Sequence, residues 1–177
     1  ISKKFIIFDD NLTKKNYLSS IIFTYQLNSN YKNISHLTKK KIKYGYKYFP
    51  IYIKKRKINI KQNKKIVLTL GGGQYFNSYE IILEYFKNTN YKFLIFCNNK
   101  LTILKLRKKY SKNSNFKFFY NLKNIFNKIP SKIEFAIING GYNKILFNFL
   151  KIPTAILNTR YHQIDLSRKF CENTLNY

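Results

Sequence analysis

Residues 66–86 read IVLTLGGGQYFNSYEIILEYF, and the order of residue types in them indicates the architecture of the chain. The first five residues form an apolar run that is too short for a helix and continuous enough for a strand buried on both faces. Three glycines follow, and the amphipathic segment 78–86 then predicts a helix. Its apolar face is expected to carry Ile81, Ile82, Tyr85 and Phe86. Strand, glycine turn and helix in this order are typical of one parallel β/α unit.

The same alternation continues toward the C-terminus. Further strands are predicted at 93–97, 116–120, 133–138 and 154–157, and helices at 101–110, 122–127, 142–150 and 163–170. Five strands with interleaved helices predict an α/β fold, a Rossmann-like doubly wound parallel sheet.

The first 50 residues have a different pattern, with strand-like segments at 5–8, 20–27 and 44–51. We interpret residues 1–53 as the remnant of an N-terminal Rossmann-like domain, and the charged stretch 54–64 as an exposed linker. Residues 65–177 then form the C-terminal domain. Because the chain begins with Ile1 and contains no methionine, it is expected to be a fragment.

The composition favours a globular protein, with 45% hydrophobic residues and a net charge of +27. Nearly all of the positive charge is lysine, and it accompanies inflated Ile, Asn, Tyr and Phe, which share A- and T-rich codons. Charge spread in this way is typical of a solvated surface, so no nucleic-acid partner is expected. Nucleic-acid binding stays as the last-ranked alternative, since it would favour arginine and the chain has four: Arg56, Arg107, Arg160 and Arg168.

No apolar run approaches the roughly 20 residues of a membrane span, so no integral membrane segment is expected. The two cysteines, Cys97 and Cys171, fit a reduced cytoplasmic protein and have no metal-type spacing. Neither a metal nor a cofactor is predicted.

Two glycine clusters are the candidate ligand-binding feature. Gly71, Gly72 and Gly73 follow one predicted strand, and Gly140 and Gly141 follow another. Turns of this kind lie at the carboxyl edge of a parallel sheet, where helix N-termini and glycine backbones accept phosphates. A diphosphate is the expected occupant, although the glycines could simply make tight turns. The GxGxxG and GxxxxGK[ST] patterns are absent, which disfavours NAD enzymes and P-loop ATPases.

Residues 68–77, LTLGGGQYFN, resemble the first glycine loop of the UDP-sugar hydrolases of pseudaminic acid biosynthesis and their spore-coat polysaccharide relatives. Asn77 falls at the asparagine of that family. Residues 135–163, FAIINGGYNKILFNFLKIPTAILNTRYHQ, are similar to its second glycine segment, with Gly140, Gly141, Leu150, Pro153 and Gln163 in register.

The resemblance implies a GT-B-like architecture and the C-terminal part of an enzyme in which water attacks the anomeric carbon and UDP departs. It implies a UDP-sugar substrate in the biosynthesis of a nonulosonic acid or surface polysaccharide. The substrate-binding residues that it implies are Gly71, Gly72, Gly73, Asn77, Gly140, Gly141, Tyr142, Asn143, His162 and Gln163.

The sequence also departs from this family. Leu146 stands where the family has a glutamate, the residue that contacts the ribose in related transferases. Tyr142 and Asn143 replace Ser and Thr, and His162 replaces Asn. The GxGH segment that holds the family's catalytic histidine is absent, so no catalytic residue is assigned. Two alternatives stay open: a GT-B glycosyltransferase, and a non-catalytic nucleotide-sugar-binding relative, which Leu146 favours.

Overall fold

The computed structural model describes residues 6–8, 21–24, 42–45, 48–49, 59–60, 64–120, 128–130 and 132–174. The chain divides into two compact units, of which one comprises Ile1–Tyr52 with Arg168–Tyr177 and the other Ile53–Ser167. The helix predicted at 122–127 lies outside the described residues.

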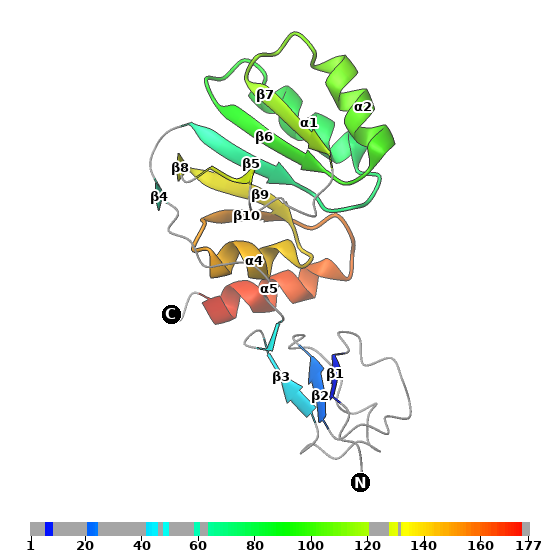
Figure 1. Cartoon of the computed structure of the whole chain (residues 1–177), viewed down its shortest axis with the longest axis vertical. Helices are drawn as coiled ribbons and strands as arrows, with labels where there is room; N and C mark the ends of the chain where they lie inside the picture. The colour runs from blue at the N-terminus through cyan, green and yellow to red at the C-terminus, as the bar shows by residue number, and fades with distance from the viewer. Residues whose placement is uncertain are drawn as a thin grey trace. The chain divides into compact units, whose positions relative to one another are not determined.

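The larger unit is built on a sheet of five parallel strands, as Figure 1 shows. In space these strands follow the order β10-β9-β5-β6-β7. Their bounds are β5 (Lys65–Thr69), β6 (Lys92–Cys97), β7 (Phe116–Tyr120), β9 (Phe135–Asn139) and β10 (Thr154–Leu157). The predicted α/β Rossmann-like fold is therefore confirmed.

A short strand pair accompanies this sheet. β4 (Asn59–Ile60) falls within the stretch interpreted as a linker, and it pairs in parallel with β8 (Lys132–Ile133). Ile133, predicted to open the following strand, therefore belongs to β8, and β9 begins only at Phe135.

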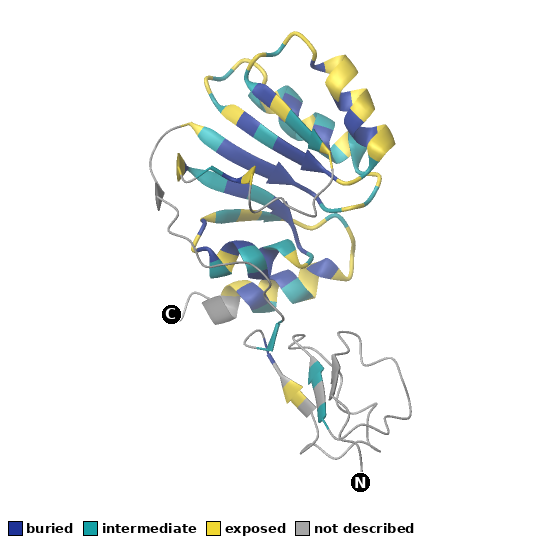
Figure 2. Ribbon diagram, in the orientation of Figure 1, coloured by how far each residue is buried: buried dark blue, intermediate teal, exposed yellow. Residues whose placement is uncertain are grey.

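Helices cover both faces of the five-stranded sheet. They are α1 (Phe76–Phe86) and α2 (Lys100–Lys109) on one face and α4 (Asn143–Phe149) on the other. A further helix, α5 (Gln163–Thr174), follows the loop after β10. Side chains of α1 and α2 share one buried cluster with Ile66 and Leu68 of β5. Val67, between them in sequence, belongs to a second cluster with Phe147 of α4. Because successive strand residues point to opposite faces, these clusters are the two halves of a three-layer core. Figure 2 shows the central strands β5, β6 and β9 as the most deeply buried part of the sheet.

The buried face of α1 differs from the prediction. Tyr79 and Leu83 are fully buried, whereas Ile81 and Tyr85 are 71% and 79% exposed. Residues 79, 82, 83 and 86 also have helical spacing, but the apolar face that they form lies about one residue away from the predicted face. The prediction was wrong because it left out Tyr79, whose hydroxyl has partners inside the core.

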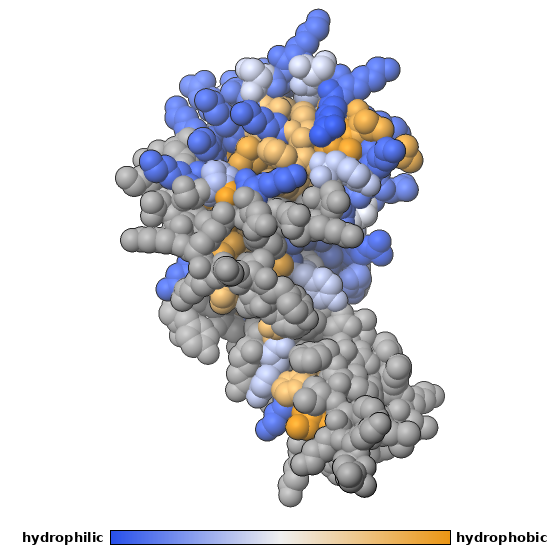
Figure 3. Space-filling model, in the orientation of Figure 1, coloured by the Kyte–Doolittle hydropathy of each residue, from blue (hydrophilic) through white to orange (hydrophobic). Residues whose placement is uncertain are grey.

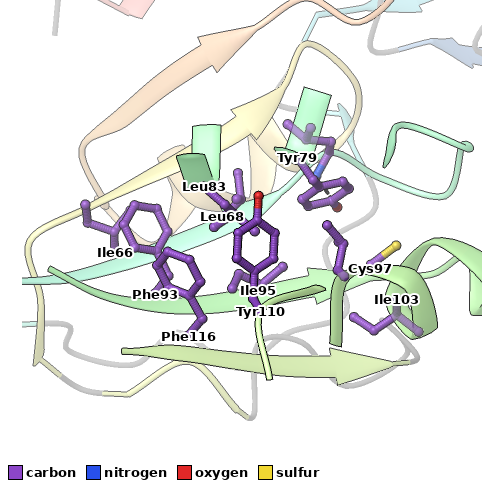
Figure 4. Close-up of a cluster of buried hydrophobic side chains, with 12 residues drawn as sticks. Ile66, Leu68, Tyr79, Leu83, Phe93, Ile95, Cys97, Ile103, Tyr110 and Phe116 are labelled. Carbon is purple, nitrogen blue, oxygen red and sulfur yellow. Dashed lines mark hydrogen bonds between the residues drawn. The ribbon is translucent and has the colours of Figure 1, made fainter. Parts of the chain in front are cut away.

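The Tyr79 hydroxyl joins two strands at the carboxyl edge of the sheet. It accepts a hydrogen bond from Leu70 N–H and donates one to the Phe96 carbonyl oxygen, each at 2.8 Å. Figure 4 shows Tyr79 and Leu83 lying with the side chains of β5 and β6. Burial raises the pKa of the Tyr79 hydroxyl, so it stays protonated and can donate. The bridge fixes the position from which the first glycine loop leaves the sheet.

A charged network joins α1 to α2. Glu84 accepts hydrogen bonds from Lys87 at 2.7 Å and from the Tyr110 hydroxyl at 2.8 Å. Lys109 binds both Glu80 and Glu84. These bonds, that of Lys87 first, lower the pKa of Glu84 from its ordinary 4.5 to about 2. Glu80 and Glu84 of α1 thus connect this helix to Lys109 at the end of α2 and to Tyr110, which follows it.

The smaller unit contains a parallel sheet of three short strands in the order β1-β2-β3. They are β1 (Ile6–Phe8), β2 (Ile21–Thr24) and β3 (Ile42–Tyr44). The third strand ends earlier than the predicted 44–51, because Gly45 has a φ of 109° and its carbonyl accepts from Tyr48 N–H in a turn.

Candidate functional site

The two glycine clusters follow neighbouring strands. β5 pairs with β9 in parallel, with Leu68 opposite Ile137 and Thr69 opposite Ile138. From β5 the chain proceeds to β6 and β7 on one side, and it later returns to β9 and β10 on the other. The carboxyl ends of β5 and β9 therefore form the switch point of a doubly wound sheet, which is the usual ligand crevice of such folds. Both glycine turns leave from this point.

The side chain of Asn139 lies between the two turns. Gly71 has a φ of 84°, and a Cβ placed on it would lie 2.9 Å from Asn139 Nδ2. A Cβ on Gly141 would lie 3.2 Å from the same nitrogen. Asn139 is buried and ends β9, so the sheet holds its amide between the two glycine turns. The sequence prediction missed this residue, although a polar side chain at the end of an apolar strand is a signal that could have found it.

Gly72 is the open position of the first turn. It is exposed, and the nearest heavy atom to a Cβ built on it is Asn98 Cβ at 3.9 Å. A ligand can therefore approach the backbone here without displacing protein atoms. This is the property that a phosphate-binding glycine requires.

Gly140 is instead covered by the chain that follows β10. A Cβ on it would lie 2.3 Å from Asn158 Oδ1 and 2.5 Å from Ser167 Oγ. These two side chains are hydrogen-bonded to each other at 2.6 Å. Glycine is required here because the loop after β10 packs directly on its α-carbon.

The helix that follows the first glycine turn has no side-chain cap. The N-cap of α1 is Tyr75, which makes no cap hydrogen bond, and its first turn holds no acidic residue. In α2, by contrast, Asn99 Oδ1 accepts from Thr102 N–H at 2.9 Å. The N–H groups of the first turn of α1, at the positive end of the helix dipole, are thus left without this compensation beside Gly72.

Other residues implied by the resemblance lie around this edge in different environments. Asn77 is exposed in the first turn of α1, and Tyr142 and His162 are exposed in the turns before α4 and α5. Asn143 Nδ2 donates to Asn139 Oδ1 at 3.5 Å. Gln163 is buried, and its Oε1 accepts from Thr159 N–H at 3.0 Å and from the Thr159 hydroxyl at 3.2 Å. The side-chain amide oxygen of Gln163 therefore orders the loop after β10.

A hydrogen bond joins this loop to the first glycine loop. Arg160 Nε donates to the Tyr75 hydroxyl at 3.1 Å, across 85 residues of sequence. The bond from Arg160, followed by one from Thr159, lowers the pKa of Tyr75. The guanidinium therefore stabilises the ionised form of this hydroxyl. Neither residue was predicted as part of the site, although Arg160 is one of only four arginines in the chain.

Leu146 lies half-buried within α4, where it offers no hydrogen-bond acceptor. Within the described part of the chain, no three His, Cys, Asp or Glu side chains gather as metal ligands would. The same part contains no helix long and apolar enough to span a bilayer. The groups that the described contacts bring to the two glycine turns are the Asn139 amide, the Tyr75 hydroxyl and the Arg160 guanidinium.

A scan against protein-family models finds no match to this sequence. A search of curated proteins also finds no match.

Proposed function

We propose that the crevice between β5 and β9 binds the diphosphate of a nucleotide sugar, and that the protein acts as a UDP-sugar hydrolase. The observation that carries this proposal is the switch point itself, where glycine turns leave two adjacent strands. The open backbone at Gly72 and the uncapped start of α1 add room and a positive field for phosphate oxygens. The choice of a UDP-sugar as the ligand rests on the motif resemblance.

In this proposal the described residues stabilise the leaving group. Water attacks the anomeric carbon, the bond from that carbon to the diphosphate oxygen breaks, and UDP takes the electron pair. Negative charge grows on the diphosphate as the bond breaks. Fixed N–H dipoles near Gly72 stabilise that charge without a metal. In the resembling hydrolases the base lies in a separate GxGH segment, so we assign to the described residues only binding and leaving-group stabilisation.

We place this activity in the biosynthesis of a nonulosonic acid or a surface polysaccharide, on the motif resemblance alone. A cytoplasmic location is part of the proposal. It is supported by the cysteine content, because two cysteines without metal-type spacing fit a reducing compartment.

Leu146 favours a second candidate function, a binding protein without catalysis. An apolar side chain stands where the family places the glutamate that holds the ribose. Without that acceptor the nucleoside would be held more loosely, while the diphosphate contacts would remain. Such a protein would bind UDP-sugars through the crevice and release them unchanged.

Calorimetric titration with UDP tests the binding that both candidates share. We expect saturable heat from the wild-type protein and weaker binding by Gly72→Ala. The added methyl group would occupy the open space at this turn, while meeting no protein atom closer than 3.9 Å. Heat no greater than that of dilution would refute the proposal. Loss of binding in Gly72→Ala is informative only if its circular dichroism spectrum matches the wild type.

Phosphorus NMR then separates the two candidates. Incubation with UDP-N-acetylglucosamine is expected to release free UDP if the protein is a hydrolase that accepts this sugar. UDP binding with an unchanged spectrum would instead support the binding protein.

A further inference from the structure

Several hydrogen bonds join the loop that follows β10 to the start of α5. Asn158 accepts a hydrogen bond from Ser167, and Thr159 donates two to Gln163. Gln163 N–H also donates to the Arg160 carbonyl oxygen at 3.0 Å. Ser167 and Gln163 are both buried, so the side chains that bond this loop are themselves held by packing.

This loop connects Arg160 to both glycine turns. Its neighbour Asn158 packs on Gly140 of the second turn. The Arg160 side chain reaches Tyr75, which lies two residues after Gly73 of the first turn. Arg160 therefore lies at the crevice, although its sequence position is far from both clusters.

The guanidinium of Arg160 keeps most of its donors for a ligand. Its Nε donates to Tyr75, and none of the described carboxylates pairs with it. The residue is exposed, and its Nη1 and Nη2 groups bond no acceptor among the described residues. A planar fork of this kind matches two oxygens of a phosphate or diphosphate, which an ammonium group cannot do.

We infer that Arg160 is the charged anchor of the crevice and binds two oxygens of the diphosphate, with Tyr75 holding the guanidinium in place. This inference rests on the proposed function and deepens it, because it selects ligands that carry a diphosphate over the nucleoside alone. The lowered pKa of Tyr75 agrees with it, since the guanidinium already favours a negative oxygen beside it.

Calorimetric titrations with inorganic pyrophosphate, UDP and uridine test this assignment in four proteins: the wild type, Arg160→Gln, Arg160→Lys and Arg107→Gln. Arg107 is the matched control, because it is exposed near the C-terminal end of α2 and bonds the Phe118 carbonyl instead. We expect Arg160→Gln to weaken pyrophosphate and UDP by at least about tenfold. Arg160→Lys should recover only part of this loss, while Arg107→Gln should bind as the wild type does. Unchanged uridine binding in Arg160→Gln is also expected.

The outcomes separate this inference from the proposed function. If UDP binds the wild type and Arg160→Gln equally well, the inference is overturned and the proposed function survives. If pyrophosphate binding depends on Arg160 but UDP binds no more tightly than pyrophosphate, the role of Arg160 is supported and the proposal that the ligand is a nucleotide is refuted. If neither ligand binds the wild type, both proposals fail.

Discussion

The side-chain amide of Asn139 lies against Gly71, so that a Cβ on this glycine would approach Asn139 Nδ2 to 2.9 Å. The end of β9 therefore shapes the turn after β5. This contact places a neutral polar group, rather than a carboxylate, at the centre of the crevice.

Asn139→Asp is expected to weaken UDP binding by about tenfold or more. The substitution keeps the shape of the side chain but brings a negative charge next to the diphosphate, and like charges a few ångströms apart repel strongly in a partly buried site. Calorimetry measures the affinity. Asn90→Asp, exposed in the turn before β6 at the opposite edge of the sheet, is the comparison; an affinity in Asn139→Asp no lower than in Asn90→Asp would contradict the placement of the ligand.

Gly140→Ala is expected to destabilise the protein by about 1–3 kcal/mol, as an overpacked contact does. Its methyl group would collide with Asn158 and Ser167, whose mutual hydrogen bond must then shift. Urea unfolding measures the loss. Gly72→Ala is the control, because the nearest atom to its methyl group is 3.9 Å away. Equal stability of the two variants would show that the loop does not pack on Gly140.

Tyr79→Phe is expected to lower the free energy of unfolding by about 1–3 kcal/mol, since it leaves Leu70 N–H and the Phe96 carbonyl without the hydroxyl that bonds both. Tyr85→Phe serves as the control, because Tyr85 is 79% exposed. Chemical denaturation of both variants provides the measurement. A loss no larger in Tyr79→Phe than in Tyr85→Phe would argue against the bridge.

Glu84 is expected to make stability depend on acid pH. Its pKa is lowered from 4.5 to about 2 in the folded protein, so its stabilisation is complete above about pH 4.5. It is lost progressively as the pH falls toward 2. Thermal melts at several pH values should therefore show the difference between wild type and Glu84→Gln shrinking through this range. A difference that stays constant from pH 6 to pH 2 would exclude the ionised network.

The sequence was sufficient for the sheet because its strands are continuous apolar runs between turn residues, and burial on both faces produces that pattern. The position of both glycine turns at one edge of the sheet could also be predicted, because parallel strands have all their carboxyl ends at the same edge. The first 50 residues were harder to assign. There Gly45 ended a strand that the apolar pattern extended to Ile51.

The side chains of the site were less predictable. Asn139 lies against Gly71, and Arg160 bonds Tyr75, and no spacing along the chain encodes these two contacts. Gln163 was expected to bind substrate, yet its side-chain amide oxygen accepts hydrogen bonds from Thr159, four residues earlier. Tyr79 was missed because a tyrosine in an amphipathic helix looks like a boundary residue until its hydroxyl finds partners in the core.

Binding of a diphosphate between the glycine turns can be observed at the glycines themselves. The chain has six glycines, so selective ¹⁵N-glycine labelling should give six amide signals, which single substitutions can assign. On addition of UDP, we predict that the signals of Gly72, Gly73 and Gly141 shift while that of Gly45, in the other unit, stays in place. Crevice signals that remain unmoved at saturating UDP, or a shift confined to Gly45, would contradict a diphosphate site at the switch point.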